Sequence, residues 1–165
     1  MANILITYST TDGHTRSICE RLQQVVEDQQ HTVVVSWMSD DPEIDLQPFD
    51  KVIIGASIRY GKHQPQVFDF IKRNQATLES KQSAFFSVNV VARKPEKNQP
   101  ETNPYLQKFL KQISWQPENL AAVSADLLAD NARAQLAGLA DARVRLGNPG
   151  ASRKAAEAVS EYLDS

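Results

Sequence analysis

Short apolar runs alternate along the chain with segments whose apolar residues recur every three or four positions. The runs predict five strands, the last of them weaker than the others, at 2–9, 31–37, 50–57, 83–90 and 119–125. The helical spacing predicts four helices, at 14–30, 63–78, 105–113 and 152–163. Because strands alternate with helices, the pattern predicts an α/β fold in which helices cover both faces of a parallel sheet.

The chain shows no internal repeat and no domain boundary, so its 165 residues are expected to form a single domain over residues 1–165. In an open parallel sheet, ligands bind at the carboxyl ends of the strands, near the point where the strand order reverses. Three loops follow the first, third and fourth predicted strands, at 9–15, 56–62 and 87–97. We therefore expect these loops to form one binding site.

The first of these loops joins a buried strand to the start of a helix, where unpaired N–H groups and the helix dipole favour an anion. Ser9, Thr10, Thr11 and Thr15 supply hydroxyl groups, and Gly13 allows a sharp turn close to a ligand. The loop has no lysine and no triphosphate-binding motif. These features favour a monoester phosphate, although the same residue types also form ordinary helix caps and turns.

Composition narrows the classes of partner. The net charge of −2, without blocks of like charge, argues against nucleic acid. No apolar run has the length of a membrane span, and the first residues lack the layout of a signal peptide, so a cytoplasmic location is expected. Cys19 is the only cysteine and is expected to be an inert thiol. The three histidines lack the spacing of metal ligands, so no metal is expected.

The string S-T-T-D-G-H-T between a strand and a helix resembles the phosphate loop of flavodoxin-like proteins. The variant with an aspartate before the glycine is similar to one family, the menaquinone-dependent (oxygen-independent) protoporphyrinogen dehydrogenases. Two further strings resemble the second and third flavin loops of that family: "VIIGASIRYGKH" at 52–63 and "FFSVNVVARKPEKNQPETNPYLQKFL" at 85–110. The resemblance covers residues 2–125.

The resemblance implies a flavodoxin-like fold with a five-stranded parallel sheet of order 2-1-3-4-5 and one non-covalent FMN. It also implies oxidation of protoporphyrinogen IX to protoporphyrin IX in haem biosynthesis, with menaquinone or ubiquinone as electron acceptor. The flavin would carry the redox chemistry, and no residue is identified as a catalytic acid or base. A weak peripheral contact with the cytoplasmic face of the inner membrane, and self-association into a homo-oligomer, are both compatible with the family.

Transferred to this sequence, the flavin-binding residues of the family fall on all three loops. They are Ser9, Thr10, Asp12, Gly13, His14 and Thr15; Ser57, Ile58, Arg59, Tyr60 and Gly61; and Ser87, Val88, Asn89, Val90, Val91 and Ala92. Tyr60 would stack on the ring, with Arg59 balancing the reduced flavin, and Asn89 would hydrogen-bond the pyrimidine edge. The alternative is that Tyr60 packs on the following helix and Arg59 is solvated.

The positive charges of the third loop suggest a substrate contact. Arg93, Lys94 and Lys97 would hold the two propionates of a porphyrinogen. The alternative is a solvated loop kept extended by Pro95 and Pro100.

The chain departs from the family after residue 125. Family members carry a long aromatic and basic insertion near the last strand, and residues 126–150 are a divergent, alanine-rich replacement. From Glu118 onward Tyr162 is the only aromatic residue, so the anchors of an interfacial helix are missing. Other functions therefore stay open: a flavodoxin-type FMN electron carrier, an NAD(P)H:quinone reductase, or a flavin domain without quinone activity. The small net charge and the basic third loop argue against the carrier.

Overall fold

The computed structural model describes residues 1–11 and 13–124, and within them one sheet forms the centre of the molecule. Its parallel strands have the order β2-β1-β3-β5-β6. Their bounds are β1 Asn3–Ser9, β2 Thr32–Trp37, β3 Lys51–Arg59, β5 Gln82–Val88 and β6 Asn119–Val123. A two-residue strand, β4 (Lys62–His63), pairs antiparallel with the end of β3. Apart from β4, this is the predicted order, so the fold prediction is confirmed.

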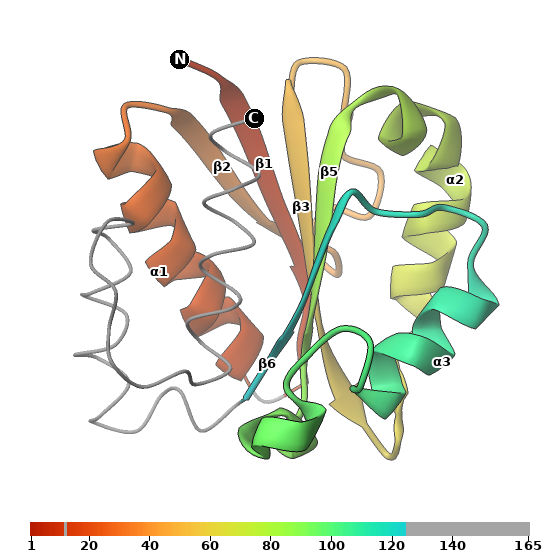
Figure 1. The fold of residues 1–165 in the computed structure, drawn as a ribbon. Coiled ribbons are helices and arrows are strands. Elements are labelled where there is room, and N and C mark those ends of the chain that lie inside the picture. The colour runs from red at the N-terminus through yellow and green to blue at the C-terminus, as the bar shows by residue number, and fades with distance from the viewer. Residues whose placement is uncertain (12, 125–165) are drawn as a thin grey trace.

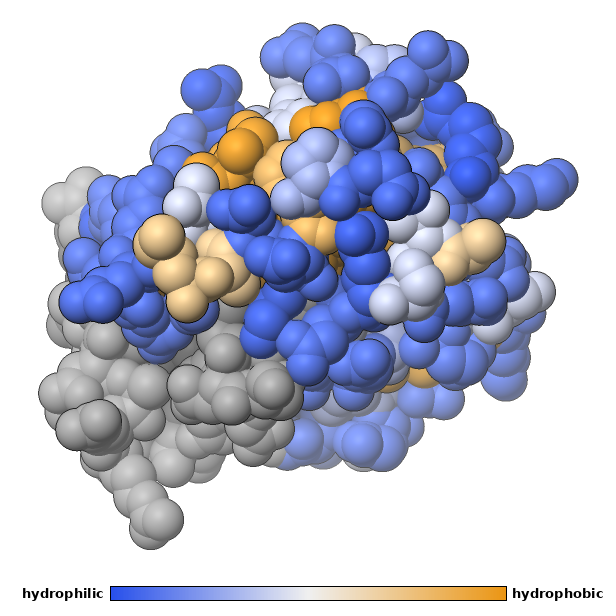
Figure 2. Space-filling view, turned by 90° about the horizontal axis from the view of Figure 1, so that it is seen from above, coloured by the Kyte–Doolittle hydropathy of each residue, from blue (hydrophilic) through white to orange (hydrophobic). Residues whose placement is uncertain are grey.

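In the described part of the chain, three α-helices cover the two faces of the sheet (Figure 1). The helix α1 (His14–Asp28) lies on one face, where its buried Ile18, Leu22 and Val26 follow each other at steps of four and pack on β1. The helices α2 (Pro65–Ser80) and α3 (Pro104–Gln112) lie on the other face. Viewed from the edge where the parallel strands begin, the surface is mostly hydrophilic (Figure 2).

The centre of β3 depends on a missing side chain. Gly55 pairs with Tyr8 of β1 and Phe86 of β5, and the Phe86 ring lies over the Gly55 Cα. A Cβ atom at position 55 would lie 2.2 Å from Phe86 Cζ. Glycine therefore gives the ring its place in the core that faces α1.

The structure corrects the prediction around residue 63. The predicted helix over 63–78 begins instead at Pro65, and the predicted strand over 50–57 continues to Arg59. Tyr60 and Gly61 have φ values of 51° and 77°, which is the backbone of a tight two-residue hairpin turn between Arg59 and Lys62. Pro65 then starts α2 at the position where a missing N–H costs nothing.

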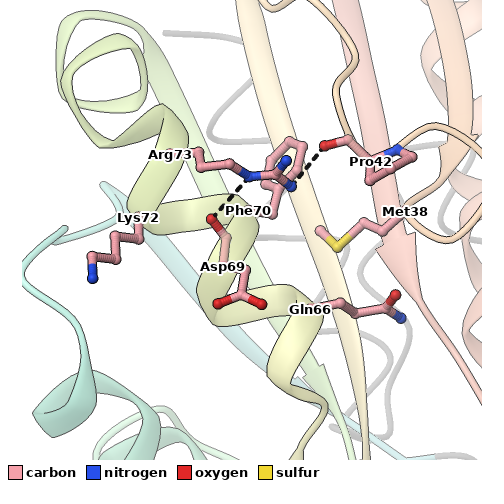
Figure 3. A pocket seen from close by; sticks show the side chains of 7 residues that line it. All are labelled: Met38, Pro42, Gln66, Asp69, Phe70, Lys72 and Arg73. Carbon is pink, nitrogen blue, oxygen red and sulfur yellow. Dashed lines mark hydrogen bonds between the residues drawn. The ribbon is translucent and has the colours of Figure 1, made fainter.

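The connection from β2 to β3, residues 38–50, crosses the sheet without a helix. Met38 and Leu46 are its buried residues. A cavity of about 420 Å³ lies between this connection and α2. At its border, the Arg73 guanidinium on α2 donates a hydrogen bond to the Pro42 carbonyl of the connection at 2.8 Å (Figure 3). The cavity lining, given in Figure 3, contains none of the residues expected to bind flavin.

Two predicted segments, the helix at 152–163 and the replacement region 126–150, lie outside the described residues. Among the described helices, none has the length and apolar character needed to cross a membrane.

Candidate functional site

The three predicted loops meet at one edge of the sheet. The carboxyl ends of β1, β3 and β5 are neighbours, since Ser9 pairs with Ala56 and Ser57 pairs with Val88. This is the lower edge in Figure 1, where the β3–β4 hairpin and two short 3-10 helices, η1 (Val90–Arg93) and η2 (Pro95–Lys97), also lie. Asp12, one of the six flavin-binding residues expected in the first loop, lies outside the described residues.

The first loop contains a buried hydroxyl group without a hydrogen-bond partner in the described structure, at the N-terminus of α1. Gly13 has a left-handed backbone (φ 85°) immediately before α1, and its N–H donates to Thr10 Oγ1 at 3.0 Å. His14 starts the helix. Thr15 is fully buried, and its hydroxyl has no hydrogen-bond partner among the described residues. Burying an unpaired hydroxyl costs about 1–3 kcal/mol, so this position fits a polar ligand such as a phosphate.

Ser9 is arranged differently from the prediction. Its buried hydroxyl donates to the Gln64 side-chain carbonyl and accepts from Gln66 Nε2 at 3.1 Å. The hydroxyl hydrogen of Ser9 therefore points to the start of α2 and not outward to a ligand. In the described structure Ser9 helps to hold the loop in place.

The second loop is the tip of the β3–β4 hairpin. Ser57 is buried, and its hydroxyl also lacks a partner among the described residues, whereas Ile58 is half-buried. Tyr60 is 86% exposed, which excludes the alternative in which it packs on α2. The Arg59 guanidinium lies 5.1 Å from the Tyr60 ring centre and donates to its hydroxyl at 3.4 Å. This hydrogen bond and charge lower the pKa of the Tyr60 phenol.

The third loop corrects the role expected of Asn89. Its side-chain oxygen accepts from Ala92 N–H at 3.1 Å and from Asn103 Nδ2 at 3.0 Å. Its side-chain nitrogen donates to Ser87 Oγ at 3.1 Å and to Asn103 Oδ1 at 3.3 Å. All four hydrogen-bonding positions of the amide are thus used within the protein, so in the described structure the Asn89 side chain shapes the loop.

Among the other residues expected to bind flavin in the third loop, Val90 alone has an exposed side chain. Ser87, Val88 and Ala92 are buried and Val91 is half-buried, whereas Val90 is 56% exposed. The predicted cations follow, with Arg93 at the end of η1, Lys94 between η1 and η2, and Lys97 at the end of η2. Arg93 and Lys94 are exposed and Lys97 is half-buried. The Lys97 carbonyl accepts from Asn103 Nδ2 at 2.8 Å, which fixes η2 to the start of α3.

Four residues that hydrogen-bond to the loops were not predicted from the sequence: His63, Gln64, Gln66 and Asn103. His63 is 4% exposed, and burial together with the nearby Lys108 charge lowers its pKa to about 4. His63, Gln64 and Gln66 carry no local motif, because Ser9 and Ser87 lie far away in sequence. Asn103 has a local signal, since an asparagine directly before Pro104 is a typical helix N-cap.

Two expectations about other side chains can be compared with the structure. Cys19 is fully buried, which raises the pKa of its thiol, so the prediction of an inert thiol is confirmed. In the described part of the chain, no three histidine, cysteine or acidic side chains are grouped so that they could hold a metal ion.

A parallel sheet in this order, with three polar loops at its carboxyl edge, defines a flavodoxin-type domain. A family model described as "Flavodoxin domain" matches residues 5–133. Among solved structures, flavodoxin 2 from Bacillus cereus superposes with a TM-score of 0.60 at 19% identity, over 86% of this chain and 97% of that one. Flavodoxin 1 from the same organism gives a TM-score of 0.59 at 13% identity, over 87% and 99% of the two chains.

Sequence comparison is more specific. Protoporphyrinogen IX dehydrogenase (quinone) of Escherichia coli (strain K12) is 41% identical over 123 residues, which is 74% of this chain and 68% of the relative. A protein of the same name from Leishmania major is 41% identical over 115 residues, covering 69% of this chain and 50% of the relative. The chain therefore belongs to the flavodoxin-domain family and, within it, to the family of the protoporphyrinogen IX dehydrogenases (quinone).

Proposed function

We propose that this protein oxidises protoporphyrinogen IX to protoporphyrin IX in haem biosynthesis, with FMN as cofactor and menaquinone or ubiquinone as acceptor. The observation that carries the proposal is the 41% identity over 123 residues to enzymes of that name. The conversion removes six electrons and six protons from the porphyrinogen. Three quinones take them up and become three quinols, so the reaction balances without another oxidant.

The described residues at the carboxyl edge fit FMN. The Thr15 hydroxyl and the N–H groups at the start of α1 would hold its phosphate, since they are buried or unpaired polar groups at a helix N-terminus. Tyr60 and Val90, exposed on loops from neighbouring strands, would flank the ring. When bound, FMN supplies the redox chemistry by accepting a hydride and passing two electrons to a quinone.

The remaining residues of the site would orient the substrate. Four cationic side chains border this edge of the sheet. Arg59 lies on the hairpin, Arg93 and Lys97 lie on the two 3-10 helices, and Lys94 lies between those helices. Guanidinium and ammonium groups bind carboxylates through charge-assisted hydrogen bonds, so these side chains suit the propionates of a porphyrinogen. Their positive charge would also offset the negative charge of a reduced flavin.

The test is an anaerobic assay of the purified protein loaded with FMN. We expect protoporphyrinogen IX to bleach the flavin, and porphyrin fluorescence to grow catalytically once a soluble quinone is added. A protein that binds FMN but produces no porphyrin would instead be an electron carrier or a flavin domain without quinone activity. Quinone reduction driven by NADPH would indicate an NAD(P)H:quinone reductase.

Removing two of the loop cations should separate substrate from cofactor. In the Arg93→Ala/Lys94→Ala variant we expect the KM for protoporphyrinogen IX to rise about tenfold and the Kd of FMN to stay unchanged, because the lost contacts are to propionates. Lys111→Ala, at the end of α3, is the matched control and should change neither value. Loss of FMN from the double variant would place these cations in the cofactor site.

Thr15→Val should have opposite effects on the two states of the protein. Valine has nearly the same shape but no hydroxyl, so the flavin-free protein should gain about 1 kcal/mol in its free energy of unfolding. The affinity for FMN should fall about tenfold, because one phosphate contact is lost. Urea unfolding and fluorescence titration measure the two values. Thr77→Val on α2 is the control, and a Thr15→Val protein that binds FMN normally would exclude Thr15 from the site.

A further inference from the structure

The four residues that follow the hairpin, His63, Gln64, Pro65 and Gln66, contact two of the flavin loops and directly continue the third. We call residues 63–66 the brace. Its position follows from the fold, since β4 ends at His63 beside the carboxyl end of β5 and α2 starts beside the carboxyl end of β1. The brace contains none of the residues assigned above to flavin or substrate.

The glutamines of the brace hold the phosphate loop. Gln64 Oε1 accepts from the Ser9 hydroxyl and from Gln66 Nε2, which donates to Ser9 as well, so the three side chains form a closed ring of hydrogen bonds. Gln66 Oε1 accepts in addition from Ser39 Oγ at 3.0 Å. The end of β1 and the residues that follow β2 are thereby tied to the first turn of α2.

The histidine of the brace holds the third loop. His63 Nε2 lies 2.9 Å from Ser87 Oγ, and the ring packs edge-on against Phe85 and Phe109, with centroids 5.7 Å and 5.1 Å away. Ser87 Oγ also accepts from Asn89, whose amide is paired with Asn103. A continuous buried hydrogen-bond network thus runs from His63 to Asn89, the N-cap of η1, and to Asn103, the N-cap of α3.

We propose that the brace sets the spacing of the three flavin loops, with Gln64 and Gln66 positioning the phosphate loop and His63 positioning the loop beside the ring. This inference rests on the proposed FMN function and assigns separate parts of the cofactor to separate brace residues. None of the three side chains needs to touch the cofactor. Each acts through Ser9 or Ser87, which makes them positioning residues and not catalytic ones.

Comparing FMN with riboflavin tests the division, because riboflavin lacks only the phosphate. We expect Gln66→Leu to weaken FMN binding about tenfold and to leave riboflavin affinity within about twofold of wild type. We expect His63→Leu to weaken FMN and riboflavin by the same factor and to shift the midpoint potential of the bound flavin. His63→Gln keeps a nitrogen close to the position of Nε2 and should restore affinity and potential.

Gln75→Leu is the matched control, because Gln75 also lies on α2 but hydrogen-bonds only Glu79 in the described structure. It should alter neither affinity. Equal losses of FMN and riboflavin affinity in Gln66→Leu would overturn the proposed role of the brace. An effect of His63→Leu that His63→Gln does not reverse would overturn it as well. A wild-type protein that binds neither flavin would overturn the proposed function itself, and this outcome is recognised without any variant.

Discussion

Replacing Gly55 by alanine should lower the free energy of unfolding by about 3 kcal/mol, because the new methyl group would enter the Phe86 ring. The ring is 2% exposed and is enclosed by the core on the α1 face, so it cannot swing into solvent. Either the ring must leave its place or β3 must separate from β5. Urea unfolding, followed by circular dichroism, measures the loss.

A variant without the Phe86 ring is the control for this prediction. In a Phe86→Leu background the side chain is shorter and more flexible, so Gly55→Ala should cost less than about 1 kcal/mol there. The double-mutant cycle then isolates the contact between positions 55 and 86. A cost of Gly55→Ala that is the same in both backgrounds would show that backbone conformation, and not the ring, requires the glycine.

Acidification from pH 7 to pH 4 should remove about 3 kcal/mol from the free energy of unfolding through His63 alone. Burial against Phe85 and Phe109, together with the nearby Lys108 charge, holds the pKa of His63 at about 4 in the folded protein, below its ordinary value of 6.5. Between these two values the unfolded chain binds a proton that the folded chain rejects. The stabilisation is complete above pH 6.5 and declines as the pH falls toward 4.

The His63→Gln variant separates this effect from the titration of other groups, because glutamine stays neutral over the whole range. Urea unfolding at intervals between pH 7 and pH 4 should give wild-type and variant curves that diverge as the pH falls. The variant should lose about 3 kcal/mol less than wild type. Curves that run parallel would show that the pKa of His63 is the same in the folded and the unfolded protein.

The sequence was sufficient to predict the parallel strands, because they appear as short apolar or β-branched runs, and β1, β3 and β5 are also mostly buried. β4 was missed because a two-residue strand has no periodicity, and because its turn is built by Tyr60 and Gly61 in place of the common Asn-Gly pair. The missed turn moved the predicted start of α2 from Pro65 to His63. Local patterns thus gave the parallel strands, the family resemblance gave their order, and unusual turn chemistry caused the error at the boundary.

The candidate site was predicted in outline for a related reason. The three loops carry many hydroxyl, amide and cationic groups, so their place at one edge could be read from chain order. The partners of those groups could not, since Ser9 reaches Gln64 and Asn89 reaches Asn103 only in the folded chain. Asn89 and Ser9 look like ligand contacts in sequence, and only their distant partners show that they support the loops.

The position of β3 between β1 and β5 has a consequence for synthesis. Residues of β3 pair on both sides, so neither core cluster can close before residues 82–88 have left the ribosome. At about 5–20 residues per second, β3 therefore keeps an open strand edge for roughly one to six seconds, until β5 emerges. The period in which a chaperone can bind the nascent chain, or neighbouring chains can aggregate, extends beyond the emergence of β5, because both core clusters also contain residues of β6.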